Sequence, residues 1–202
     1  MKKNVGISYK AFAVILAAVL VLGGTIGGTM AWLIDDTEAV ENTFTYGDIN
    51  IGLAETTGTA YKIVPGVDLK KDPKVTVNAG SEDCWLFVKV EEANWPAFTE
   101  DDGTTKKVAY SIAAGWTALE GHEGVYYREV KSPTTDASFS VLKDDKITVS
   151  ENLKKTEIDT VKNQKPELTF TAYAVQKAEI ASVTVAWEKA EAEAKEQGET
   201  TN

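Results

Sequence analysis

The sequence contains few side chains that could carry out acid–base, nucleophilic or metal chemistry. It holds one histidine, His122, and one cysteine, Cys84. A zinc peptidase of the common helical type needs two histidines one helical turn apart, with a glutamate between them. His122 instead lies in the stretch EGHEG, residues 120–124, whose glycines indicate a turn. We therefore predict no Cys/His metal site and no cofactor, and we expect that the protein is not an enzyme.

The other polar candidates are weaker. The residues of a Ser–His–acid triad have no fixed spacing in the sequence, because they come together only in the fold. The sequence does, however, lack the nucleophile-elbow motif that often contains the serine. Cys84 precedes a run of bulky residues, so we expect a half-buried apolar side chain and not a reactive thiol. The acidic clusters at residues 100–103 and 144–145 lack the spacing of an EF-hand loop. We interpret them as solvated turns, with calcium binding as the alternative.

Tryptophan is the one aromatic residue whose placement bears on binding. Most of the five tryptophans are expected to pack in the core or on strands. Trp95, next to Pro96, has the alternative of an exposed loop position in which it contacts a partner or a glycan. The five are Trp32, Trp85, Trp95, Trp116 and Trp187.

Length and composition limit the class of protein. The 202 residues are 43% apolar, which predicts one folded domain with tails. Acidic residues outnumber basic ones by 31 to 21, for a net charge of −10. This balance argues against nucleic-acid binding and against docking of the folded part on anionic lipid. A single cysteine excludes an intramolecular disulfide.

The first 31 residues have the pattern of an export signal. A basic start is followed by an unbroken apolar run over residues 11–22, and small residues, Thr29 and Ala31, then precede Trp32. These features predict a signal-peptide helix and cleavage between Ala31 and Trp32. The basic residues are Lys2, Lys3 and Lys10.

An uncleaved membrane anchor is the alternative for the same segment. Twenty-four uncharged residues separate Lys10 from Asp35, which is enough to span a bilayer. Four glycines in this stretch weaken a helix there. Cleavage is the favoured prediction, and we then expect membrane contact only through the signal peptide before it is removed.

The remainder of the chain predicts an all-β domain followed by one helix. Short alternating segments separated by Gly and Pro turns indicate seven or eight strands in a sandwich or jelly roll. The segments are residues 44–53 (with a bulge or bend at Gly47-Asp48), 75–79, 85–90, 125–130, 139–142, 147–149 and 168–175. Along 168–175, even-numbered residues are expected on one face and odd-numbered residues on the other.

A helix is predicted near the C-terminus, because apolar residues recur there at helical spacing. The β-branched residues 182–185 leave open a strand at its start. The predicted divisions are a signal peptide (1–31), a mature N-terminal segment (32–43), a β-sandwich domain (44–197) and a polar tail (198–202). The apolar helix face consists of Ile180, Val183, Trp187, Ala190 and Ala194.

Several short motifs, taken in order, resemble one family. GGTMAWL at residues 27–33 is followed by an acidic stretch and then by NTF at 42–44. Further along the chain come NAGS at 78–81 and TAYAVQ at 171–176, with Ala-Trp at 186–187. Together these resemble the TasA/camelysin family of Gram-positive proteins, which are exported with a SipW-type signal peptide. Met30 departs from the aromatic residue that is usual before the cut.

The resemblance implies a jelly-roll-like antiparallel β-sandwich and a role in the protein fibres of a biofilm matrix. In this family the freed N-terminal segment is donated as a strand to the next subunit. The matching residues here are an apolar leader, Trp32, Leu33 and Ile34, and a polar stretch, Asp35, Asp36, Thr37 and Glu38. An unpaired sheet edge that accepts a strand head-to-tail gives a filament that does not close.

The resemblance also implies a location and partners. We expect a secreted protein in the extracellular matrix or at the cell surface, where it pairs with itself or with a related matrix protein. A SipW-type signal peptidase would act on it during export. One alternative for the segment 32–42 is a tail that is disordered or folds back on its own domain. Alternatives for the whole protein are a monomeric adhesin, a fibre-anchoring accessory protein and, disfavoured by the lone histidine, a camelysin-like peptidase.

Overall fold

The computed structural model describes residues 32–33, 42–46, 48–57, 62–161 and 166–199. The chain divides into two compact units, Met1–Ala31 and Trp32–Asn202. The whole first unit lies outside the described residues, and with it the expected signal-peptide helix and its cut-site residues Thr29 and Ala31. Within the described part, no helix is both long enough and apolar enough to cross a bilayer.

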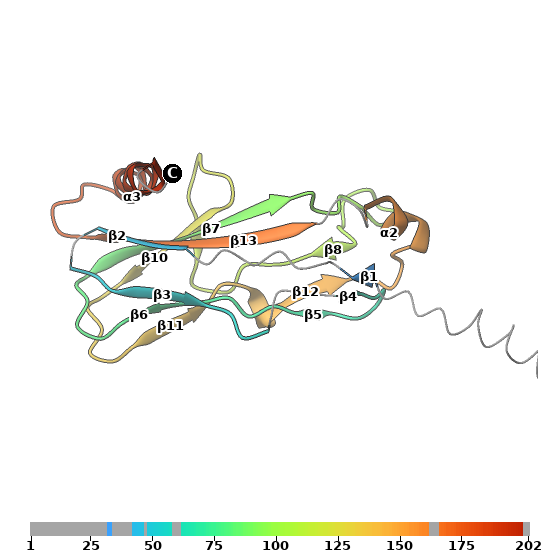
Figure 1. Cartoon of the computed structure of the whole chain (residues 1–202), viewed down its shortest axis with the longest axis horizontal. Helices are drawn as coiled ribbons and strands as arrows, with labels where there is room; N and C mark the ends of the chain where they lie inside the picture. The colour runs from blue at the N-terminus through green and yellow to red at the C-terminus, as the bar shows by residue number, and fades with distance from the viewer. Residues whose placement is uncertain (1–31, 34–41, 47, 58–61, 162–165, 200–202) are drawn as a thin grey trace, which may run out of the picture. The chain divides into compact units, whose positions relative to one another are not determined.

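A five-stranded sheet contains the two longest strands (Figure 1). Its order is β2 (Asn42–Tyr46), β13 (Glu167–Gln176), β7 (Cys84–Ala93), β10 (Val125–Val130) and β9 (Thr117–Ala118). β13 and β7 pair antiparallel along all ten residues of each. β2 is parallel to β13, and every other described ladder is antiparallel.

Smaller sheets complete the β structure. One has the order β11-β6-β3 and forms the layer that faces the five-stranded sheet in Figure 1. Another has the order β5-β12-β8, and β1 pairs with β4 alone. The bounds are β1 (Trp32–Leu33), β3 (Ile51–Ala54), β4 (Lys62–Ile63), β5 (Leu69–Lys70), β6 (Lys74–Val77), β8 (Val108–Ala109), β11 (Ala137–Ser140) and β12 (Lys146–Val149).

The main core lies between the layers and follows the alternation of the strands. Leu168 and Phe170 of β13, with Ala172 and Ala174, face inward and are buried, as the sequence predicted. They meet fully buried residues of β6 such as Val75. The prediction of mostly antiparallel sheets with a C-terminal helix is therefore confirmed, in an arrangement compatible with a β-sandwich.

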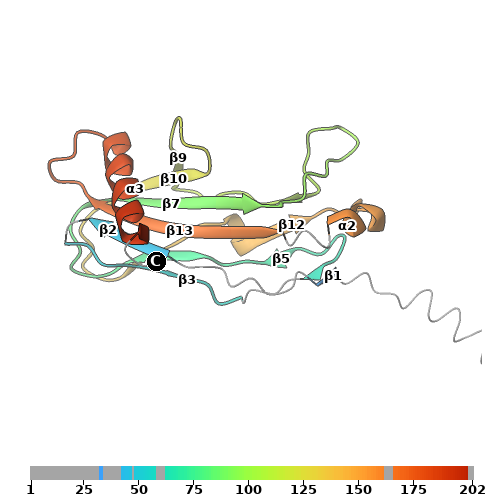
Figure 2. The ribbon, with the colours of Figure 1, turned by 45° about the horizontal axis from the view of Figure 1, so that its top comes forward.

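A second core lies on the outer face of the five-stranded sheet, beneath α3 (Val183–Glu199) (Figure 2). Trp187 is only 2% exposed, and its ring centroid lies 5.4 Å from that of Phe87 and 5.1 Å from that of Tyr173. The Ser182 hydroxyl accepts a hydrogen bond from the Val185 N–H, at 3.3 Å. This N-cap explains why the β-branched start of the segment is helical and not a strand.

Two predictions about the elements need correction. Residues 44–53 are not one bent strand, because β2 ends at Tyr46 and β3 begins at Ile51 in the opposite sheet. The bend expected at Gly47-Asp48 lies in the connection between these strands, and Gly47 itself lies outside the described residues. The sequence analysis also missed α2 (Lys155–Val161), a helix of seven residues.

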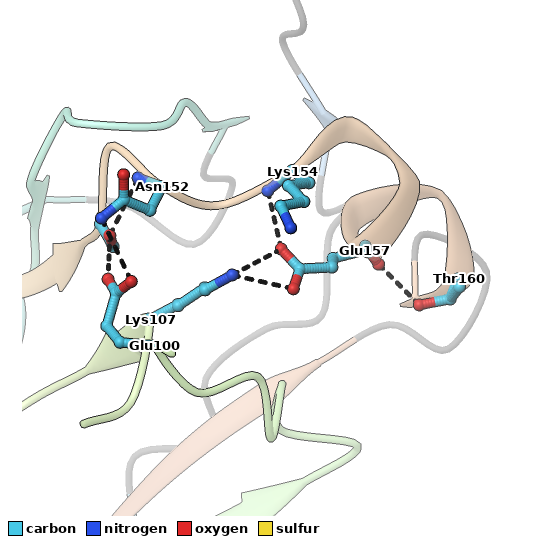
Figure 3. A network of polar contacts seen from close by, with 7 residues as sticks. Glu100, Lys107, Asn152, Lys154, Glu157 and Thr160 are labelled. Carbon is cyan, nitrogen blue, oxygen red and sulfur yellow. Dashed lines mark hydrogen bonds and ion pairs between the residues drawn. The ribbon is translucent and has the colours of Figure 1, made fainter. Parts of the chain in front are cut away.

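Charged side chains anchor α2 to the sheets (Figure 3). Lys107, which is 3% exposed, donates to both carboxylate oxygens of Glu157, at 2.9 and 3.2 Å. Glu157 also accepts the Lys154 N–H at 2.7 Å. That backbone bond, together with Lys107 and against a smaller effect of burial, lowers the pKa of Glu157. A short helix with few apolar contacts is therefore held at its N-terminus by a charge-assisted network.

We expect Trp187→Ala to destabilise the domain by about 3–5 kcal/mol, because it removes the largest buried side chain between α3 and the sheet. Val185→Ala is the matched control, since Val185 lies in the same helix and is exposed. Denaturant unfolding followed by circular dichroism measures both variants. Equal stabilities would show that α3 does not depend on this contact.

Candidate functional site

The first described residues after the expected cleavage point form a very short strand pair. β1 begins at Trp32 and pairs antiparallel with β4, with Trp32 opposite Ile63 and Leu33 opposite Lys62. Among the described strands, β4 has no other partner. The backbone groups on this edge of β4 are therefore paired only as long as the N-terminal segment stays in place.

The turn that follows β4 fixes its end and leaves an apolar side chain exposed. Pro65 and Gly66 occupy the centre of the turn, with Gly66 at φ 75°, and the Val67 N–H donates to the Val64 carbonyl at 3.0 Å. This is the residue pattern of a type II turn. Ile63 is buried in the main core, whereas Val67 is 52% exposed. The turn therefore places an exposed valine next to the end of β4.

A buried carboxylate holds the loop that leads toward β4. Asp72 accepts the N–H groups of Thr56 and Thr57, at 2.9 and 3.0 Å, and the Thr56 hydroxyl at 2.5 Å. Burial by itself raises the pKa of Asp72, but these hydrogen bonds outweigh it and lower the pKa from 3.8 to about 2. The ionised carboxylate thus ties the loop after β3 to the start of β6.

A second charged contact reinforces the same loop. The Lys71 ammonium lies 2.7 Å from the Glu55 carboxylate, and both side chains are almost fully buried, at 5% and 7% exposed. The ammonium also lies 5.6 Å from the centroid of the Phe170 ring. Removing either charge would take this ion pair from a buried charge, which is destabilising. Residues 55–57 are therefore tied to Lys71 and Asp72 by charged contacts.

β2 offers a second edge. It is the outer strand of the five-stranded sheet, and its far side pairs with no other described strand. β2 begins at Asn42, near the end of the predicted N-terminal segment. The described parts of this segment thus pair with β4 through β1 and with β13 through β2.

The structure describes only part of the predicted donor segment. Trp32 and Leu33 pair with β4 of their own chain, which is the fold-back arrangement. Ile34, Asp35, Asp36, Thr37 and Glu38 lie outside the described residues. The donation of residues 32–38 to a neighbour accordingly stays a prediction.

The residues weighed for chemistry lie apart from these edges. His122 is in a turn, as predicted, but it is half-buried, and its ring lies edge-on to Trp187 with the centroids 6.1 Å apart. Cys84 is fully buried and not half-buried. Burial, helped by the charge of Asp83, raises the pKa of the Cys84 thiol to about 12. A thiol that is buried and protonated has little reactivity.

The acidic clusters form hydrogen-bonded turns. Asp102 accepts the N–H groups of Thr104 and Thr105, both at 2.8 Å, while Glu100 accepts a bond from Asn152 at 3.2 Å. Asp144 and Asp145 belong to a short 3-10 helix, η1 (Lys143–Asp145), and both have positive φ. Over the described residues, no group of three or more metal-ligating side chains comes together.

Sequence reasoning missed two buried lysines and one half-buried arginine. Lys71 and Lys107 lie in runs of lysine that resemble solvated surface, and only their partners in space explain their burial. Arg128 is the single arginine, and its guanidinium carbon lies 3.6 Å from the centroid of Phe139 and 5.4 Å from that of Trp116. Stacking between rings suits a planar guanidinium better than an ammonium. No local sequence signal indicates these contacts.

Comparison of this chain with protein-family models, with curated proteins and with solved structures found no match. A function is therefore inferred from the strand edges described above and from the sequence motifs.

We expect Asp72→Asn to destabilise the domain by about 1–3 kcal/mol at neutral pH, because the hydrogen bonds lose their charged acceptor. The pKa of Asp72 is lowered in the folded state, so its ionised form stabilises the fold fully above about pH 4. That contribution is lost as the pH falls toward 2. The stability difference between the original protein and the variant should therefore shrink over this window.

Urea unfolding at a series of pH values measures this difference. Asp101→Asn is the matched control, since Asp101 is an exposed carboxylate at a loop tip. A stability difference that stays constant from pH 5 to pH 2 would contradict the assignment of the hydrogen bonds to an ionised Asp72.

Proposed function

We propose that this protein is a secreted structural protein that forms or joins extracellular matrix fibres. The mature N-terminal segment, residues 32–38, is donated as a strand to the next subunit. The proposed acceptor is β4, and the proposed fold is a jelly-roll-like sandwich. The role is structural and not enzymatic. Partners are other copies of this chain or a related matrix protein.

The observation that carries this proposal is the β1–β4 pair. It begins at the first residue after the expected cut, it is two residues long, and β4 has no other described partner. A strand that pairs within its own chain marks an edge that an identical strand from a neighbour fits equally well. Such an exchange gives a head-to-tail contact, which extends into a filament.

The energetics permit exchange of the β1 strand between chains. A two-residue ladder contributes only about one or two net hydrogen bonds, or roughly 1–3 kcal/mol. Exchange between chains restores the same bonds, so the equilibrium is set by chain entropy and by any additional contacts. Ile34 provides one further apolar residue, and the exposed Val67 lies in the turn beside β4. A neighbour's segment that contacts Val67 would gain apolar burial.

The sequence motifs support the same role independently of the edges. The export signal with small residues before Trp32 releases the segment, and the ordered motifs resemble the TasA/camelysin family. A monomeric adhesin or a fibre-anchoring accessory protein is the alternative. It differs from the proposal in one respect that can be observed, because it forms no filaments by itself.

We expect protein that begins at Trp32 to form filaments and protein that begins at Ala39 to remain a folded monomer. The shorter form lacks the donated strand but keeps every residue of the larger sheets. Size-exclusion chromatography and negative-stain electron microscopy across concentration and pH compare the two. Filaments from the shorter form would rule out donation, and folded monomers from both forms would favour the accessory role.

Mixed cysteine variants test the acceptor strand itself. Leu33→Cys in one chain and Lys62→Cys in another should form a covalent heterodimer within filaments, because directly opposed residues lie within disulfide reach. Cys84 is buried and does not interfere. Leu33→Cys mixed with Lys131→Cys, an exposed position outside β4, is the matched control. Filaments that contain no heterodimer would exclude β4 as the acceptor.

A further inference from the structure

A hollow of about 310 Å³ lies where β7 ends and β8 begins, away from the residues of the strand-exchange site. Its walls combine aromatic rings with one carboxylate and one ammonium group. Sites for small molecules likewise combine apolar surface with polar groups that fix the orientation of the ligand. The residues used below are Glu92, Trp95, Lys106, Tyr110 and Tyr126.

The aromatic residues are held in place and yet remain partly open. Trp95 and Tyr110 meet edge to face, with ring centroids 5.8 Å apart and planes at 82°. Both rings and Tyr126 are half-buried and pack against the main core. Each ring is therefore fixed from behind by the sandwich, while part of its surface stays accessible to a ligand.

The polar groups are also positioned. The Tyr110 hydroxyl donates to the Glu92 carboxylate at 2.8 Å, which orients both side chains. Burial, and then the hydrogen bond and charge of Glu92, raise the pKa of Tyr110, so the hydroxyl stays protonated and continues to donate. Glu92 still has free acceptor positions, because a carboxylate has about four lone-pair sites. Lys106 provides donors on the same wall.

The left-handed backbone conformation of Asn94 sets the position of Trp95. Asn94 has φ 52° and follows the last residue of β7. Asparagine tolerates this conformation better than other residues with side chains. The turn takes the chain out of the strand direction, so that Trp95 leaves the sheet and lines the hollow.

We propose that this hollow binds a neutral saccharide. The apolar face of a pyranose ring would lie on Trp95, with ring hydroxyls donating to Glu92 and accepting from Lys106. We choose a neutral ligand because the hollow contains one positive and one negative side chain. Lys106 repels a cation from the aromatic rings, and Glu92 repels an anion. A sugar uses flat aromatic surface, an acceptor and a donor together. The proposal is independent of fibre formation.

Titration of ¹⁵N-labelled protein with cello-, chito- and galacto-oligosaccharides tests the site by NMR. We expect saturable shifts of the Trp95 indole N–H and of the amides of Glu92 and Tyr110, with a Kd of about 1 mM or below for at least one sugar. Trp95→Ala should weaken binding by roughly three- to tenfold or more. Trp95→Phe keeps a ring in the hollow and should retain part of the affinity.

Adjacent carboxylates on β7 provide the matched control. Glu92→Gln should weaken sugar binding, whereas Glu91→Gln should leave it unchanged, because neighbouring strand residues point to opposite faces. A polyproline peptide and tetramethylammonium chloride are titrated in parallel. The proposal is overturned if no sugar shifts these signals, if only the peptide or the ammonium ion shifts them, or if Glu91→Gln and Glu92→Gln behave alike.

Discussion

The ten-residue antiparallel ladder between β7 and β13 is the contact on which the other parts of the structure depend. The inner faces of both strands are buried in the main core, and α3 covers the outer face around Phe87, Tyr173 and Val175. Because side chains alternate, a one-residue slip would move Leu86 and Val88 out of the main core and force Phe87 into it. The second core, the flanking strands β2 and β10 and the position of α3 therefore all require this single register.

The same ladder explains what the sequence could and could not predict. β13 and α3 have clear periodicity, because each has one face in a core, and their positions and buried residues were predicted. β7 was predicted over residues 85–90 from its bulky and β-branched side chains alone. Five described strands, β1, β4, β5, β8 and β9, have two residues each, which is too short for any period to be visible. The sequence also did not predict that residues 44–53 divide between two sheets. A chain that passes from one layer to the other has apolar residues both before and after the connection, as a single strand does.

Buried charge was the other part that local sequence could not predict. Lys71 pairs with Glu55, and Lys107 with Glu157 fifty positions away. Each ion pair forms between residues that the fold brings together, and no sequence motif predicts it. The candidate sites divide in the same way: the strand role of Trp32 and Leu33 was expected from the cleavage pattern together with the family resemblance, whereas their partner β4 was not predicted. An exposed position of Trp95 was only the alternative to core packing, and the fold alone brings it together with Glu92, Lys106 and Tyr110.

The contrast between long and short ladders indicates which parts of the molecule can exchange. Opening β7 from β13 would expose two cores at once, whereas opening β1 from β4 breaks a pairing of only two residues, and Ile63 of β4 is itself buried in the main core. A weakly closed strand on a domain whose cores stay packed can exchange without global unfolding. The saccharide hollow uses none of these backbone groups, since its residues come from the end of β7, from β8 and the loops beside it, and from β10. Assembly through β4 would therefore leave the residues of the hollow unchanged, and a fibre of such subunits would carry the same sugar site at every repeat. Such repetition converts a weak single site into strong attachment through multivalency.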